Sequence, residues 1–206
     1  MLIEQPPLLY RLLFPEALWR INRKGQRTVY LTFDDGPIPE VTPWVLDLLD
    51  SYNIKATFFL VGDNVRRNPH LLEEIKRRDH SWGNHTMHHL QGMKVTALRY
   101  IRDITEADIL IGSPLFRPPH GLLRWKQAAA IKSHYNIVMY DLVTRDYSRK
   151  LSPDQVVENV KRYARNGSII VFHDSLKAEK NLREALPRAI QWLRNQGYEF
   201  KKIPMQ

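Results

Sequence analysis

Two adjacent carboxylates, Asp34 and Asp35, directly follow a run of β-branched and aromatic residues at 28–33. Two like charges this close raise each other's proton affinity unless a cation or hydrogen-bond donors neutralise them. We therefore expect one aspartate to bind a cation, whose charge keeps the second aspartate ionised and available as a base. The alternative is that one aspartate caps the following helix while the other is solvated.

Two histidines, His85 and His89, stand four residues apart in the stretch HTMHH. On one turn of helix this spacing aims two imidazoles at a shared point, which is the geometry that metal sites use. The chain has no cysteine, so a transition-metal site must use histidines and carboxylates. Two neutral histidines and one aspartate leave positions open for water and substrate, as in catalytic sites. His88, between the two, is expected to point elsewhere.

Three further polar stretches follow predicted strands: RPPHG at 117–121, TRDY at 144–147 and HD at 173–174. The carboxyl ends of parallel strands lie on one face of a sheet or barrel, where such folds place their active sites. We therefore expect these stretches to meet the aspartates and the histidine pair. For His173 the alternative is a buried structural role.

The elements that must position these residues alternate along the chain from residue 28. This alternation of strand-like and helix-like patterns predicts an α/β fold of parallel βα units. A closed or partly closed barrel of about seven parallel strands with outer helices is the most economical arrangement, and an open doubly wound sheet is the alternative. The predicted strands are 28–33, 56–61, 80–84, 115–117, 136–142, 168–172 and 198–203, and the predicted helices are 42–53, 69–78, 96–112, 124–134, 152–167 and 181–197, with Thr42 and Ser152 as N-caps.

The chain has 206 residues, which fits a single domain, and a net charge of +9. A basic surface could attract nucleic acid, anionic lipid or an acidic polymer. Because the lysines and arginines are scattered, we expect a solvated basic surface and no nucleic-acid partner. The oligomeric state is not predictable from the sequence.

Residues 1–27 are apolar in pieces and lie before the alternating region. We expect an N-terminal extension packed on a catalytic domain of residues 28–206. The alternative is peripheral contact with a membrane, because basic residues outnumber acidic ones in this segment. No secretory signal is recognisable and no run of 18 apolar residues occurs, so we expect a cytoplasmic location, with membrane association as the variant of that expectation.

Taken together, the stretches TFDDGP, HTMHH, RPPHG, DY and IIVFHD resemble, in order and spacing, the motifs of the polysaccharide deacetylase family. This is the NodB-homology domain of carbohydrate esterase family 4. The resemblance runs from about residue 28 to 203, and residues 1–27 lie outside it. It implies a distorted (β/α) barrel and a divalent metal, usually Zn²⁺, with Co²⁺, Ni²⁺ or Mn²⁺ as alternatives. It also implies an N-acetylated glycan as substrate.

The resemblance also implies roles for individual residues. Asp34 would be the general base and His173 the general acid, and Arg117 and Asp146 would pair with them. Pro119, His120, Tyr147 and Val171 would contact the substrate, and the backbone N–H near His120 would help to stabilise the oxyanion. The metal ligands would be Asp35, His85 and His89.

Three motifs depart from the family pattern. Val143 and Tyr147 replace an aspartate and a tryptophan, Val171 replaces a leucine, and His120 stands where an aromatic residue often follows. These changes concern the acyl group and the fit of the sugar. The function expected is removal of N-acetyl groups from a GlcNAc-containing polysaccharide or oligosaccharide. The alternatives are hydrolysis of a different small amide, glycan binding without turnover, and, least favoured, a phosphatase aspartate loop.

Overall fold

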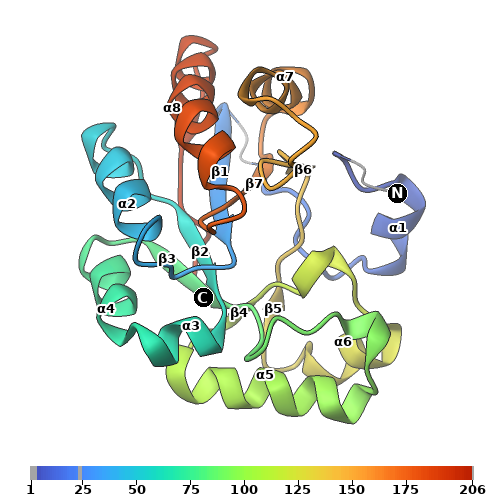
Figure 1. The fold of residues 1–206 in the computed structure, drawn as a ribbon. Coiled ribbons are helices and arrows are strands. Elements are labelled where there is room, and N and C mark those ends of the chain that lie inside the picture. The colour runs from blue at the N-terminus through green and yellow to red at the C-terminus, as the bar shows by residue number, and fades with distance from the viewer. Residues whose placement is uncertain (1–3, 23–24, 206) are drawn as a thin grey trace.

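We analysed a computed structural model of the protein, and the structure describes residues 4–22 and 25–205. Its centre is a curled sheet in which all the paired strands run parallel (Figure 1). The strand order is β5-β4-β3-β2-β1-β7-β6, and β8 pairs with β1. The strands are β1 Thr28–Asp34, β2 Thr57–Leu60, β3 Ser81–Asn84, β4 Leu115–Phe116, β5 Asn136–Ile137, β6 Leu142–Val143, β7 Ile169–His173 and β8 Glu199–Phe200.

The barrel is incomplete, because in the described part of the chain β5 and β6 form no pair with each other. The prediction of a distorted, partly closed (β/α) barrel is therefore confirmed, and the open doubly wound alternative is wrong. Helices surround the sheet (Figure 1). They are α1 Leu8–Leu13, α2 Thr42–Ser51, α3 Gly62–Arg67, α4 Pro69–Arg77, α5 Ala97–Ile111, α6 Trp125–Ile131, α7 Pro153–Tyr163 and α8 Glu179–Asn195, with short 3₁₀ turns η1 Gly92–Lys94 and η2 Pro119–Gly121.

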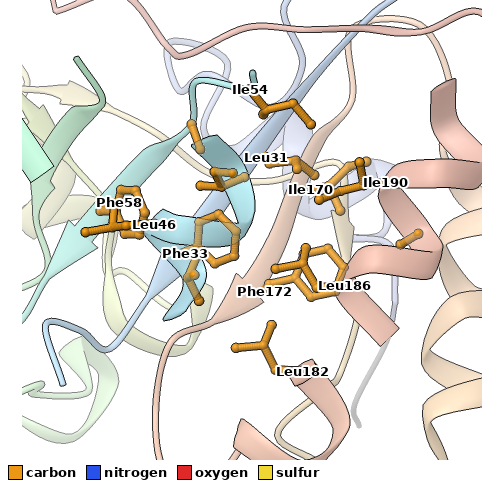
Figure 2. Close-up of a cluster of buried hydrophobic side chains, with 14 of the residues drawn as sticks. Leu31, Phe33, Leu46, Ile54, Phe58, Ile170, Phe172, Leu182, Leu186 and Ile190 are labelled. Atoms are coloured by element: carbon orange, nitrogen blue, oxygen red, sulfur yellow. The ribbon is translucent and has the colours of Figure 1, made fainter. Parts of the chain in front are cut away.

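The main core lies between the central strands and the helices that follow them (Figure 2). Every residue of β1 is buried, as expected for a strand covered on both faces. The rings of Phe33 and Phe172 on β1 and β7 stack with centroids 6.2 Å apart, and Leu186 and Ile190 of α8 belong to the same cluster. This packing fixes β1 and β7 side by side, and with them the residues at their carboxyl ends.

The gap between β5 and β6 is occupied by the N-terminal segment. Leu18 forms a parallel bridge with Val138, and Arg20 forms an antiparallel bridge with Ser168. Near the start of this segment, the carbonyl of Glu4 accepts a hydrogen bond from the Val143 N–H at 2.8 Å. Residues 4–22 therefore stand where a further strand and its outer helix would close the barrel.

The outer face of α1 is apolar and exposed. On the inner face of the helix, Tyr10 donates a hydrogen bond to the Gly121 carbonyl and Arg11 donates one to Asp141. All four leucines of the helix are more than half exposed. None of the described helices combines the length and apolarity that a membrane crossing needs.

Several local predictions were wrong. The strand expected at 136–142 breaks into β5 and β6, because the carbonyls of Val138 and Met139 accept hydrogen bonds from Arg117. Helix α3 was not expected, since only Val65 marks its buried face together with Gly62. The helix expected at 152–167 ends at Tyr163, and the strand expected at 198–203 covers only β8.

The expected N-cap at Thr42 was also wrong. Thr42 is already inside α2, and its hydroxyl makes no capping bond. Ser152, by contrast, caps α7 in a reciprocal pair with Gln155, as predicted.

Candidate metal centre and active site

The turn that follows β1 places the two aspartates in different environments. Asp34 is the last residue of β1, and Asp35 follows it with a left-handed backbone, φ 79°. The Asn64 side chain on α3 donates to the Asp35 carbonyl at 2.8 Å. Because the chain changes direction between the two residues, the carboxylates of Asp34 and Asp35 can occupy different positions.

Asp35 meets both predicted histidines. Its Oδ1 lies 3.0 Å from Nε2 of His89 and 3.8 Å from Nε2 of His85. One ligand atom from each of the three residues lies within 4.8 Å of the other two, close enough to hold one metal ion. The structure therefore brings the predicted Asp–His–His set together.

The donor chemistry of this set fits a divalent metal. The Nδ1 of His85 lies 2.7 Å from the Arg117 carbonyl, so Nδ1–H donates to it and Nε2 keeps its lone pair facing Asp35. Burial lowers the pKa of His85 to about 4, which keeps the imidazole neutral. Burial would raise the pKa of Asp35, but the hydrogen bond from His89 and the nearby imidazoles outweigh it and lower that pKa. A neutral imidazole and an ionised carboxylate are the forms that bind metal.

The local conformation of HTMHH differs from the predicted helical turn. Residues 85–91 form a loop in which Thr86 and His89 have positive φ. The Asp103 carboxylate on α5 accepts the N–H groups of Met87 and His88, which fixes the loop. His88 points away, as predicted, and its Nδ1 lies 2.5 Å from Asp103. The two ligands converge through loop geometry rather than helix periodicity.

Asp34 is held by a buried arginine. The Nη1 of Arg117 donates to Asp34 Oδ1 at 2.7 Å and to the Thr32 hydroxyl at 2.7 Å. The guanidinium is almost completely buried and lies over the Phe59 ring, 4.0 Å from its centroid. The second oxygen of Asp34, Oδ2, lies 4.0 Å from Nε2 of His85. One oxygen is thus anchored while the other faces the candidate metal ligands.

His173 ends β7 and is paired with a buried carboxylate. Its Nδ1 lies 2.8 Å from Asp146 Oδ1, and its backbone N–H donates to Asp146 Oδ2 at 2.7 Å. Burial would lower the pKa of His173, but the charge and hydrogen bond of Asp146 outweigh it and raise the pKa to about 9. The raised pKa favours the protonated imidazolium form of His173 at neutral pH.

Asp34 and His173 lie at the same level of two adjacent strands. In the β1–β7 register, Asp34 stands directly opposite His173. The site therefore has a carboxylate and an imidazolium on neighbouring strands, both beside the Asp–His–His set. The negative charge of Asp35 and Asp34 contributes to the raised pKa of His173, which shows that these groups share one electrostatic environment.

The four predicted substrate contacts divide into two groups. The ring of His120 lies 4.8 Å from the His89 ring, and the ring of Tyr147 lies 4.7 Å from that of His173. These two flank the site. Pro119 and Val171 are buried, in η2 and in β7 respectively. Val171 stands two residues before His173 on the strand, so it faces the same side of the sheet.

Some residues that shape the site carry no motif of their own. Asn64, Asp103 and Thr32 have no predicted role, and Thr42 is predicted only as an N-cap, because each acts through a backbone group or a distant side chain. Asp174 belongs to the HD stretch, and the sequence alone predicts no separate role for it. It is fully buried, and burial raises its pKa to about 8.

Comparisons with known proteins find relatives over most of the chain. The family model described as polysaccharide deacetylase matches residues 21–137. A peptidoglycan-N-acetylglucosamine deacetylase of Bacillus cereus is 33% identical over 193 residues, covering 90% of each chain. A chitooligosaccharide deacetylase of a Bradyrhizobium strain is 30% identical over 201 residues, covering 87% of this chain and 90% of that relative.

Among solved structures, a peptidoglycan N-acetylglucosamine deacetylase in complex with a substituted benzamide superimposes with a TM-score of 0.87 at 29% identity. The match covers 97% of this chain and 95% of the other. Most of residues 1–27 therefore lie inside the structural similarity, whereas the sequence motifs alone began near residue 28.

Proposed function

Since the chain belongs to the polysaccharide deacetylase family, we propose that it is a metal-dependent hydrolase that removes N-acetyl groups from GlcNAc-containing glycans. The observation that carries the proposal is the juxtaposition of the Asp–His–His set with Asp34 and His173. Relatives at 30–33% identity are named for deacetylation of peptidoglycan and of chitooligosaccharide, which supports hydrolytic N-deacetylation as the reaction class.

Asp35, His85 and His89 would hold the metal. A divalent ion bound there would supply a Lewis acid that polarises the amide carbonyl and lowers the pKa of a water molecule. Two imidazole nitrogens and one carboxylate oxygen form a ligand set typical of catalytic Zn²⁺, and Co²⁺, Ni²⁺ and Mn²⁺ accept similar donors.

Asp34 and His173 would then carry out the two proton transfers of the reaction. Asp34, oriented by Arg117, takes the proton of the attacking water through its free oxygen. His173, protonated and oriented by Asp146, gives its proton to the leaving amine. The second transfer is essential because an unprotonated amide nitrogen is a very poor leaving group. Tyr147, whose ring lies 4.7 Å from that of His173, and Val171, two residues before His173 on β7, would line the space for the acetyl group.

A panel of acetylated oligosaccharides, with released acetate measured in the presence and absence of added zinc, tests the proposal. We expect acetate release that chelation abolishes and zinc restores. Asp34→Asn should bind zinc but release no acetate, whereas the exposed and distant Asp154→Asn should behave as wild type. Undiminished release from chelated protein or from Asp34→Asn would contradict the proposal. Turnover confined to small amides would support the alternative substrate class instead.

A further inference from the structure

Asp174 is a buried carboxyl group that the proposed chemistry leaves unused. It follows His173 directly, has no exposed surface, and its Oδ1 has no hydrogen-bond partner among the described residues. Burying a carboxyl group with an unsatisfied oxygen costs free energy. Because such a group is unfavourable for stability, Asp174 is better explained by its contacts with the turn that carries Asp35.

The Asp174 carboxyl group lies directly against the turn that carries Asp35. A Cβ atom added to Gly36 would stand 2.1 Å from Asp174 Oδ2 and 2.6 Å from its Cγ, which no real side chain tolerates. The backbone N–H of Asp174 also donates to the Asp34 carbonyl at 3.1 Å. The turn between Asp34 and Gly36 is therefore packed and bonded against Asp174.

Thr42 completes the connection from the other side of the turn. Its hydroxyl donates to Asp174 Oδ2 at 2.6 Å and accepts the Ile38 N–H at 2.7 Å. Both side chains are fully buried, so these bonds are shielded from water. The segment from Asp34 to Thr42 is thus tied to the end of β7, on which His173 stands.

We propose that Asp174 and Thr42 are positioning residues, which set the place of the metal ligand Asp35 and of the base Asp34 relative to the acid His173. The expected effect on catalysis rests on the proposed function. The expected effect on metal binding does not depend on that function. Groups that orient metal ligands without touching the metal typically contribute about 10- to 100-fold in metal affinity or activity.

The test compares Thr42→Val with Thr42→Ser, and Asp174→Ala with Asp174→Asn. The first member of each pair removes the contact between the two side chains, and the second retains an oxygen that can make it. We expect Thr42→Val and Asp174→Ala to weaken zinc binding about 10- to 100-fold, measured by competition with a chromogenic chelator. Their kcat should fall while the KM for an acetylated oligosaccharide stays near the wild-type value. The second members should recover most of both losses.

Thr57→Val is the matched control. Thr57 is also fully buried, and its hydroxyl likewise accepts a backbone N–H, that of Ile203 at 2.9 Å, but it lies at the amino end of β2. This control should lower the melting temperature without changing zinc affinity. If Asp174→Ala does not fold, the nearly isosteric Thr42 pair decides.

Zinc affinity is measured without turnover, so the two proposals fail separately. If the wild type releases acetate but Thr42→Val has the same zinc affinity and kcat as Thr57→Val, the positioning role is overturned and the proposed function stands. A wild type that binds zinc but releases no acetate overturns the proposed function, and the zinc affinities of the variants then still decide the positioning role.

Discussion

His173 carries a proton that its burial alone would remove. Asp146 reverses this, because its carboxylate is fully buried and accepts both the ring Nδ1–H and the backbone N–H of His173. The Arg117–Asp34 pair is the counterpart on β1, with a cation holding the carboxylate. Each of the two proposed proton carriers thus has one buried partner of opposite charge, which fixes its orientation as well as its charge.

Asp146→Asn is expected to shift the pH dependence of kcat. The pKa of His173 is raised to about 9, so the acid form is present below that pH and is lost as pH rises through it. Removing the Asp146 charge lowers the pKa of His173, so the alkaline limb of the pH–kcat profile should move to lower pH. Zinc affinity, measured in parallel, should be little changed. An alkaline limb that stays in place would show that His173 is not the acid.

The residues of the site were predictable to different degrees. Asp34, Asp35, His85, His89 and His173 stand in short motifs at strand ends, so residue type and spacing were sufficient to bring them together. Thr42 and Asp174 are 132 residues apart, and nothing in either neighbourhood indicates the contact. Such pairs depend on how β7 and α2 pack, which a local pattern does not encode.

Strand β3 begins beside a buried histidine, His80. Its Nδ1 accepts the Ala56 N–H at 3.1 Å, which only the neutral ring can do. The contact links the residue before β3 to the residue before β2, and the His80 ring packs edge-on against Phe58. The start of this strand pair therefore depends on an uncharged imidazole.

Acid is expected to destabilise the fold through His80. Burial lowers the pKa of His80 to about 4 from the ordinary 6.5, so between these values the unfolded chain binds a proton that the folded chain does not. The free energy of unfolding should fall as pH drops from about 6.5 to about 4, by up to about 3 kcal/mol from this group. Denaturant titrations of wild type and His80→Asn across this range measure the effect.

His80→Asn keeps an acceptor for Ala56 without a titrating ring, so it should lose part of the pH dependence. The exposed His134→Asn should keep the wild-type dependence. If the free energy of unfolding changes with pH equally in wild type and in His80→Asn, His80 is not the cause of the acid destabilisation.

Elements were predictable where hydrophobic periodicity was strong and long. The pattern at 96–112 placed α5 closely, and the start of α7 was predicted correctly from Ser152 as its N-cap, although that helix ends at Tyr163. Prediction failed where tertiary contacts replace local ones: Arg117 draws carbonyls out of the strand expected at 136–142, and Asp103 holds residues 85–91 as a loop.

The molecule as a whole is closed by its N-terminal segment rather than by a β5–β6 pair. Asp141 joins this segment to the sheet near the amino end of β6. The buried carboxylate binds Arg11 at 2.8 Å, Arg165 at 2.6 Å and the Ser168 hydroxyl at 2.7 Å. Three segments far apart in the chain therefore meet at one side chain.

Asp141→Ala is expected to destabilise the protein by about 1.5–3 kcal/mol, because it removes charge-assisted hydrogen bonds of a buried carboxylate, although the half-exposed Arg165 that it leaves behind can be solvated. Chemical denaturation measures this change. Zinc affinity of the folded variant should be unaffected, since Asp141 lies at the end of the barrel opposite the site. Asp154→Asn, which breaks an exposed pair with Arg188, should cost less than about 1 kcal/mol. A loss for Asp141→Ala as small as this control would contradict the role.

Peripheral membrane contact through residues 1–27 stays a prediction. Residues 1–3 and 23–24 of this segment lie outside the described residues. It requires that anionic vesicles co-sediment the protein more than neutral ones do, and less at high salt. Changing the four exposed leucines of α1 to glutamine should abolish this binding. The same change at Leu98 and Ile109, exposed on α5, should not. Equal sedimentation of wild type and the α1 variant would exclude docking through this helix.

The closing bridges of the barrel also govern when the fold can form. Leu18 and Arg20 bond to residues near 138 and 168, and β1 bonds to β7 and β8. During synthesis, the earlier partner of each of these contacts must wait for more than a hundred residues to emerge from the ribosome. Until then the apolar strand β1 has β2 on one edge and no native neighbour on the other. A nascent chain of this topology is a natural client for chaperones.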